Sequence, residues 1–141
     1  MEVLFIAGFA VIVPEPGPAQ RFYRDVLGLP LATDSGNPDY AATNDLDGAK
    51  HFGVWPLADA AESCFGSREW PANVAVPQAT IEFELASPDA VAAGARELEA
   101  QGYSMLHGAR TEPWGQITAR LLGPEGLLIG LSYAPWFHES D

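Results

Sequence analysis

The sequence is poor in cysteine and in positive charge. Its 141 residues include one cysteine, Cys64, and only seven lysines and arginines, of which Lys50 is the only lysine. A lone cysteine excludes an intramolecular disulfide and a metal cluster held by thiolates, and it is compatible with a reducing compartment. We therefore expect a cytoplasmic protein.

The scarcity of cations leaves a strongly acidic chain. Nineteen aspartates and glutamates give a formal net charge of −12. Such a surface repels phosphate groups, so nucleic acid and anionic membranes are poor partners. It would attract cationic small molecules, although an acidic surface is more often a means of staying soluble.

Long hydrophobic segments are also lacking. The N-terminal run MEVLFIAGFAVIVPEP is too short to span a bilayer. It has no basic region at its start and no small-residue cleavage site before Pro14, as a signal peptide would have. We interpret residues 4–13 as a buried strand.

What the sequence does contain is an internal repeat. The amphipathic segment AQRFYRDVLGLPL (19–31) runs into Gly28, and a second helical segment (89–103) runs into Gly102 in the same way. An apolar strand precedes each helix, and a turn followed by a strand closes each half. We predict one domain over 1–141 made of two β-α-β-β-β units: module 1 at about 1–57, a linker at about 58–77, module 2 at about 78–135 and a tail at 136–141.

Strand alternation divides the residues between two faces. In the strand at 80–85, Ile81, Phe83 and Leu85 should pack on a helix, which leaves Thr80, Glu82 and Glu84 on the other face. The same alternation brings the following residues to that second face: Gly8, His51, Gly53, Trp55 and Gly130. A curved sheet with such a face would enclose a pocket, and its glycines would enlarge that pocket.

Four segments carry a resemblance to a known family: RFYRDVLGLPL (21–31), TIEFEL (80–85), EPWGQITARLLGPEG (112–126) and LLIGLSY (127–133). The chain resembles the vicinal oxygen chelate superfamily, which includes glyoxalase I, bleomycin resistance proteins and extradiol dioxygenases. The resemblance implies an α+β fold in which two βαβββ modules form an open, U-shaped barrel. It also implies a homodimer, often with modules exchanged between chains.

The same resemblance implies where a divalent metal would bind. Enzymes of the superfamily place His, Gln or Glu ligands on the first and last strands of each module, and the matching positions here are Gly8, Gly53, Thr80 and Gly130. A catalytic metal needs about three protein ligands, and these four offer one hydroxyl. A shift of two positions at Gly53 would bring in His51 or Trp55, and still only one good ligand. We therefore expect no metal and no other cofactor.

Because it lacks metal ligands, the chain is most similar to the drug-binding branch of the superfamily. We expect it to sequester a hydrophobic, planar or cationic compound, such as an antibiotic, in a homodimer cavity, in a resistance or carrier role. We assign no catalytic residue and lean against an enzyme. The residues expected to bind the ligand are His51, Trp55, Trp70, Thr80, Glu82 and Trp114.

Other interpretations remain open for these residues. Glu82 could pair with Arg110 or Arg120 instead of meeting a ligand, His51 could be a packed side chain, and Trp70 could be a dimer contact or a lid. The alternative function is a lyase, isomerase or dioxygenase of the same superfamily, with Glu82 or His51 as a proton shuttle. A third is a structural homodimer with a vestigial cavity.

Overall fold

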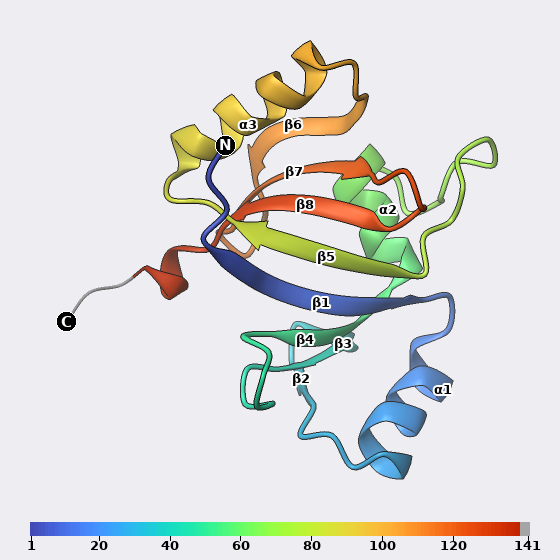
Figure 1. The fold of residues 1–141 in the computed structure, drawn as a ribbon. Coiled ribbons are helices and arrows are strands. Elements are labelled where there is room, and N and C mark those ends of the chain that lie inside the picture. The colour runs from blue at the N-terminus through green and yellow to red at the C-terminus, as the bar shows by residue number, and fades with distance from the viewer. Residues whose placement is uncertain (139–141) are drawn as a thin grey trace.

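The computed structural model describes residues 1–138 and shows one eight-stranded, curved sheet with helices on both faces (Figure 1). The first half of the chain contains β1 (Phe5–Val13), α1 (Pro16–Gln20), the π-helical η1 (Arg21–Val26), β2 (Ala32–Asp34), β3 (Asn37–Thr43) and β4 (Phe52–Pro56). The remainder contains α2 (Leu57–Phe65), β5 (Ala79–Glu84), α3 (Pro88–Ala100), β6 (Met105–Thr111), β7 (Ile117–Leu122), β8 (Leu128–Tyr133) and the 3₁₀ turn η2 (Pro135–Phe137). The predicted α+β class is confirmed.

The strand order β2-β3-β4-β1-β5-β8-β7-β6 places the two halves of the chain side by side. In each half the first strand pairs in parallel with the last, β1 with β4 and β5 with β8. The halves join through the antiparallel pair β1–β5, in which Ala10 lies opposite Thr80 and Gly8 opposite Glu82. The sheet is therefore continuous within a single chain.

Two helical segments cover the outer face of the sheet, one over each half (Figure 1). The α1–η1 segment packs on a cluster around Leu31, Ala41 and Val54, and α3 packs on a cluster around Leu85 and Val91. Helix α3 is amphipathic and buries one apolar stripe, as its sequence period predicts. The α1–η1 segment instead packs on the sheet through Ala19 and Tyr23, whereas Phe22 and Val26 are 49% and 68% exposed. Of the three residues predicted to pack on a helix, Leu85 does so and is fully buried. Ile81 and Phe83 are only partly buried and are not part of the cluster under α3, so the prediction is wrong for these two.

Helix α2 packs on the opposite, concave face. Its Ala60 and Cys64 join Ala10, Ile12 and Leu128 in one apolar cluster near the end of β1 and the start of β8. The helix ends at Gly66, whose φ of 76° is a left-handed conformation that glycine adopts without strain. Helix α2, which lies between the two halves in the sequence, thus covers one end of the concave face and leaves the rest of that face open.

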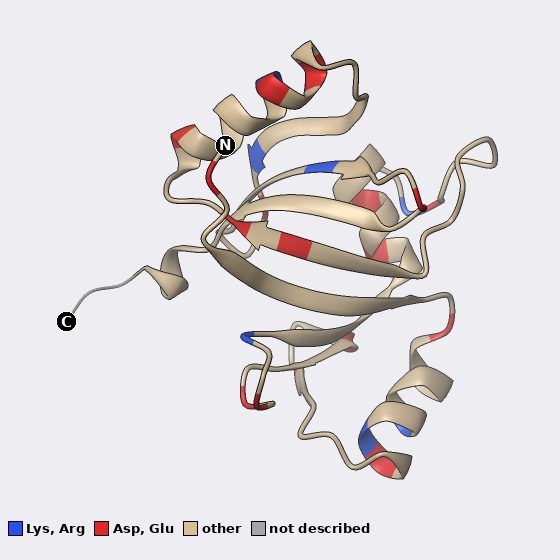
Figure 2. Ribbon diagram, viewed as in Figure 1, with Lys and Arg blue, Asp and Glu red and all other residues tan. Residues whose placement is uncertain are grey.

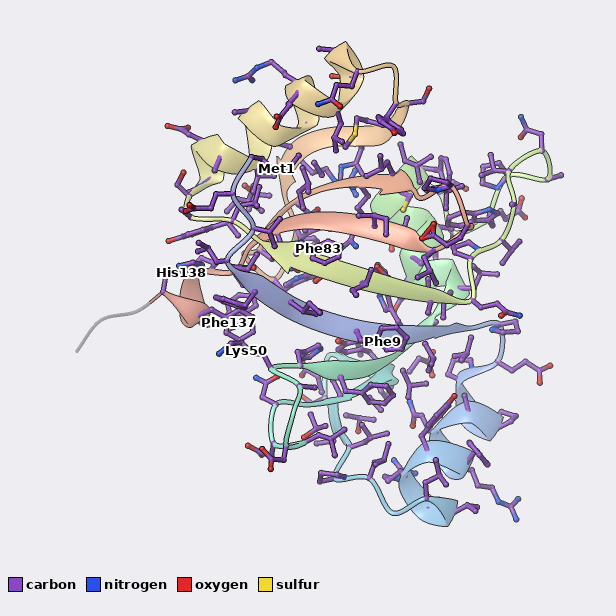
Figure 3. All side chains as sticks on the ribbon, viewed as in Figure 1. Met1, Phe9, Lys50, Phe83, Phe137 and His138 are labelled. Atoms are coloured by element: carbon purple, nitrogen blue, oxygen red, sulfur yellow. The ribbon has the colours of Figure 1, made fainter. Side chains whose placement is uncertain are left out.

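The outer face of β1 and β5 is uncovered between the two helical segments, and Phe9 and Phe83 lie on it (Figure 3). Ile6 and Phe9 are 51% and 37% exposed. At the C-terminal end, Phe137 meets the Phe5 ring edge-on, with the ring centroids 5.8 Å apart. Residues 139–141 of the predicted tail lie outside the described residues. No helix in residues 1–138 has the length and apolar character needed to cross a membrane.

Candidate functional site

The concave face of the sheet encloses a cavity of about 970 Å³. Its walls come from β1, β3, β5 and β7, from helix α2, from the loop before β7 and from the C-terminal segment. Of the six residues predicted to bind a ligand, five line this cavity: His51, Trp55, Thr80, Glu82 and Trp114.

Trp70, the sixth, lies elsewhere. Its indole meets the Phe65 ring edge-on, with the ring centroids 4.9 Å apart, and donates to the carbonyl oxygen of Val74 at 3.0 Å. These contacts join residues within the linker between the two halves and stabilise its conformation. Glu84, also expected on the cavity face, is fully buried outside the cavity, where it accepts from Ser132 Oγ at 2.7 Å.

The floor of the cavity contains an ion pair that spans a glycine. Glu82 on β5 lies opposite Gly130 on β8, and Gly130 lies opposite Arg120 on β7. Arg120 Nη1 lies 2.8 Å from Glu82 Oε2. A Cβ on residue 130 would lie 3.1 Å from Glu82 Cγ and 3.3 Å from Arg120 Nη1. The absence of a side chain at Gly130 is therefore what lets the two charged groups meet.

Arg120 is deeply buried, with 1% of its surface exposed. Its guanidinium carbon lies 5.1 Å from the centre of the Trp55 ring, at cation–π distance. Burial opposes the charge, but Glu82, Cys64 and Glu112 outweigh that effect and raise the pKa of Arg120. The group is a fixed positive charge inside an acidic protein.

Sequence reasoning considered Arg120 only as a partner for Glu82. Its position in the cavity could have been found from strand alternation, because Ile117, Ala119 and Leu121 form one face of β7 and Thr118 and Arg120 form the other. What alternation does not give is the burial, which depends on the Trp55 ring from the other half of the chain.

A chain of side-chain hydrogen bonds holds Glu82 from the other side. Gln116 Nε2 donates to Glu82 Oε1 at 2.9 Å and to Ser132 Oγ at 2.8 Å. Trp114 Nε1 in turn donates to Gln116 Oε1 at 2.8 Å. Both oxygens of Glu82 are therefore engaged, one by Gln116 and one by Arg120. The EPWGQ segment orients this carboxylate.

A second polar pair, Tyr40 and His51, lies over two other glycines of the concave face, Tyr40 over Gly53 and His51 over Gly8. Tyr40 Oη is 2.5 Å from His51 Nε2, and His51 Nδ1 is 2.6 Å from Asn44 Oδ1. With the amide oxygen of Asn44 as acceptor, Nδ1 carries the hydrogen, Nε2 accepts and Tyr40 donates. A Cβ on residue 53 would lie only 2.8 Å from Tyr40 Oη, so Gly53 makes room for this tyrosine.

Burial acts on both members of this pair. It lowers the pKa of His51, with Glu82 acting weakly in the other direction. It also raises the pKa of Tyr40, and the nearby charge of Glu82 adds to the effect. Both groups are therefore neutral near pH 7, as the hydrogen-bond pattern requires.

A third carboxylate, Glu112, links the cavity wall to helix α2. Its Oε1 accepts from Ser63 Oγ at 2.7 Å and from Thr118 Oγ1 at 2.9 Å, and Arg110 Nη2 lies 3.7 Å away. Arg110 also donates to the carbonyl oxygen of Ser63. Glu112 is almost fully buried, so this cluster is a structural tie between β6, β7 and α2.

The superfamily's metal does not fit these residues. Gly8, Gly53 and Gly130 offer no side-chain donor atom, and the space above two of them holds the Tyr40 and Arg120–Glu82 side chains. Across residues 1–138, no group of three or more His, Cys, Asp or Glu side chains is arranged to hold a metal ion. The expectation that every glycine enlarges the pocket is wrong at Gly53 and Gly130, because longer side chains occupy that room.

The mouth of the cavity is aromatic and acidic. Trp114 and Trp136 line it and are 50% and 43% exposed. Nearby, Arg68 is paired with Asp59 at 2.9 Å and with Glu62 at 3.0 Å. Acidic side chains outnumber basic ones over the whole chain (Figure 2). The entrance therefore combines stacking surfaces with a negative field.

Comparison with known proteins agrees with this architecture. The family model described as Glyoxalase/Bleomycin resistance protein/Dioxygenase superfamily matches residues 6–131, and the chain belongs to this superfamily. No curated protein matches the sequence. The predicted family and its fold are thereby confirmed.

Solved structures share the fold at low sequence identity. A glyoxalase/bleomycin resistance protein/dioxygenase superfamily member from Vibrio splendidus has a TM-score of 0.59 and 15% identity, over 92% of this chain and 97% of that chain. Methylmalonyl-CoA epimerase from Mycobacterium tuberculosis has a TM-score of 0.58 and 16% identity, over 97% and 93%. A Mn(II)-bound glyoxalase from Novosphingobium aromaticivorans has a TM-score of 0.54 and 21% identity, over 92% and 38%.

Proposed function

We propose that this protein binds a planar, largely hydrophobic small molecule in its cavity without a metal ion. The observation that carries the proposal is a cavity of about 970 Å³ in which protein side chains occupy the space above two of the expected metal positions, Gly53 and Gly130. Volumes of about 300–1,000 Å³ are usual for sites that bury most of a drug-sized compound. A resistance or carrier role in the cytoplasm, for example towards an antibiotic, suits such a protein.

The aromatic residues at the mouth support a planar ligand. Trp114 and Trp136 line the cavity and expose much of their ring surface to water. Covering an aromatic face with another ring stabilises a complex by about 0.5–1.5 kcal/mol beyond area burial. Trp114 is held in place through Gln116, so its ring is partly preorganised for such a contact.

The charge of the ligand is a separate matter. Glu82 was expected to meet a cation, but both of its oxygens are already occupied by Arg120 and Gln116. The support for a cationic ligand therefore shifts to the acidic mouth, where Arg68 partly neutralises Asp59 and Glu62. The hydrophobic and planar parts of the proposal are the ones supported by the cavity itself.

A thermal-shift screen of planar compounds tests the proposal. A compound that binds only the folded state must raise the unfolding temperature, because it stabilises that state by RT ln(1 + L/Kd), where L is the concentration of free compound. Trp114→Ala should weaken binding of any stabilising compound by up to about tenfold, the loss of one ring stack. Trp70→Ala is the matched control, because that tryptophan lies outside the cavity. A screen without a single stabilising compound would count against the proposal and favour a vestigial cavity.

The Tyr40–His51 pair favours a second candidate, an enzyme that moves a proton without a metal. His51 Nε2 has its lone pair on Tyr40, and Asn44 fixes the ring from the other nitrogen. A base oriented in this way is the usual arrangement for proton transfer. Proton NMR of a bound carbonyl compound in D₂O would show exchange of its α-protons if the pair transfers them. Without exchange, binding alone remains.

We further propose a homodimer formed through the uncovered outer face of β1 and β5. Its outward side chains are apolar, namely Ile6, Phe9, Ile81 and Phe83, and the register places them next to one another. Two copies of net charge −12 repel each other over most of their surface, so an uncharged strip is where they can meet. Light scattering of Phe9→Glu should show a monomer, whereas an unchanged mass would reject this face.

A further inference from the structure

We propose that Arg120 and Thr80 form a subsite for an oxygen of the ligand, so that the compound bound in the cavity carries a carboxylate or a carbonyl group. The inference rests on the proposed function and specifies its ligand. It reverses the sign of the charge that the acidic composition suggests. Arg120 would take the place of the metal cation that enzymes of the superfamily hold at this position.

Unsatisfied atoms on the concave face are the first observation. Arg120 Nε and Thr80 Oγ1 are buried and make no hydrogen bond with any residue in the described part of the chain, and Arg120 Nη1 has only its ion-pair contact with Glu82. Buried polar groups in native proteins nearly always have a partner, and those without one call for an explanation. Arg120 and Thr80 both line the cavity, and their exposed fractions are 1% and 3%.

The chemistry of these atoms selects the partner. A guanidinium can only donate, and a threonine hydroxyl can donate as well. The complement is an acceptor, and carboxylate and carbonyl oxygens are the acceptors that match the planar fork of an arginine. An ammonium group would meet a buried guanidinium of its own sign, beside a carboxylate whose charge Arg120 already balances.

The second observation is the position of the guanidinium. Gly8, Glu82, Gly130 and Arg120 form one row across four neighbouring strands. Thr80 is two residues from Glu82 on the same strand and faces the same side. Two of the superfamily's metal positions, Gly8 and Gly130, are in this row, and a third is Thr80. The ligand oxygen that a metal would have held therefore meets Arg120 and Thr80.

Glu82 balances the charge of Arg120 and so sets the strength of the subsite. Its carboxylate lies 2.8 Å from Nη1, and it competes with an incoming acceptor for the same guanidinium. Removal of that negative charge should therefore strengthen the binding of an acceptor ligand. A site that recognised cations through Glu82 would respond in the opposite direction.

Three probes that share one ring system test the proposal: 2-naphthoate, 2-acetylnaphthalene and 2-naphthylmethylamine. Titrations at about 0.15 M salt limit the long-range field of the acidic chain, which alone would favour the amine. We expect the acid and the ketone to bind, and the amine to bind about tenfold more weakly or not at all. A preference for the amine would overturn the subsite and leave the proposed function standing.

Variants show whether the negative charge of Glu82 weakens or strengthens the binding of an acceptor ligand. Glu82→Gln should tighten the binding of 2-naphthoate by about threefold or more, whereas Glu99→Gln, an equal charge change on the outer helix α3, should leave it unchanged. Weaker or unchanged binding in Glu82→Gln contradicts the subsite. Arg120→Met should abolish 2-naphthoate binding if it folds, which circular dichroism checks. If it does not fold, the Glu82→Gln comparison decides the matter alone.

Discussion

We predict that Gly53→Ala lowers the free energy of unfolding, and the size of the loss can be estimated from the contacts around Gly53. The backbone there has no positive φ, so alanine meets no conformational strain. Its Cβ would lie 2.8 Å from Tyr40 Oη and 3.2 Å from Tyr40 Cε1, closer than real contacts. Tyr40 must move, and its hydrogen bond to His51 is then lost or lengthened.

The magnitude follows from opposing terms. Replacing glycine by alanine in a compatible backbone stabilises by about 0.4–1 kcal/mol. Overpacking a filled site costs about 1–3 kcal/mol. Leaving a buried hydrogen-bonding group unpaired costs about 1–3 kcal/mol more. The net expectation for Gly53→Ala is a loss of about 1–5 kcal/mol in the free energy of unfolding.

Gly8→Ala is the matched control. It is also a strand glycine on the concave face, but its nearest neighbour, His51 Cβ, is at an ordinary contact distance of 3.4 Å. We expect Gly8→Ala to change the free energy of unfolding by less than about 1 kcal/mol. Chemical denaturation with intrinsic tryptophan fluorescence measures both variants.

A double-mutant cycle isolates the cause. Tyr40→Phe removes the oxygen that the new Cβ would strike, so Gly53→Ala should cost less in that background than in the wild type. Equal costs in both backgrounds, or equal costs for Gly53→Ala and Gly8→Ala, would refute the claim that Tyr40 occupies the space above Gly53.

Three further predictions concern buried polar groups. Gly130→Ala should destabilise the fold by about 1–3 kcal/mol in denaturation experiments, because its Cβ pushes on the Arg120–Glu82 pair; unchanged stability would contradict the packing. Burial lowers the pKa of His51, so the unfolded chain binds more protons, and stability should fall as the pH drops below about 6.5. His51→Phe should flatten that fall between about pH 7 and 5, and an identical slope would remove His51 as its source. Burial raises the pKa of the Cys64 thiol to about 11, so a thiol reagent should label it only on unfolding, and rapid labelling of the native protein would contradict its packing.

The scaffold could be predicted from the sequence because it depends on local periodicity. The apolar stripe of α3, the glycines that follow both helical segments and the alternation in TIEFEL are each readable within about ten residues. These patterns located β1, α3 and β5, and the face on which Thr80 and Glu82 lie. The resemblance then supplied the combination of the two modules in one open barrel, which no local pattern contains.

The site was only partly predictable because its important contacts join residues far apart in the sequence. Glu82 meets Arg120 across β8, and the Trp55 ring covers Arg120 from the first half of the chain. Tyr40 and His51 are eleven residues apart in the sequence, and only the folded sheet brings Tyr40 over Gly53 and into contact with His51. A glycine in a sequence shows that a side chain is missing, but which neighbour fills the vacated space depends on the three-dimensional packing.

One measurement tests the central claim, that this cavity binds its ligand through protein groups placed at the superfamily's metal positions. The purified protein is analysed for bound metals, treated with a chelator and titrated with 2-naphthoate before and after addition of Mn²⁺, Ni²⁺ or Zn²⁺. We predict metal well below one equivalent and the same Kd in every sample. A stoichiometric metal that survives dialysis, or binding that appears only when a metal is added, would contradict the claim.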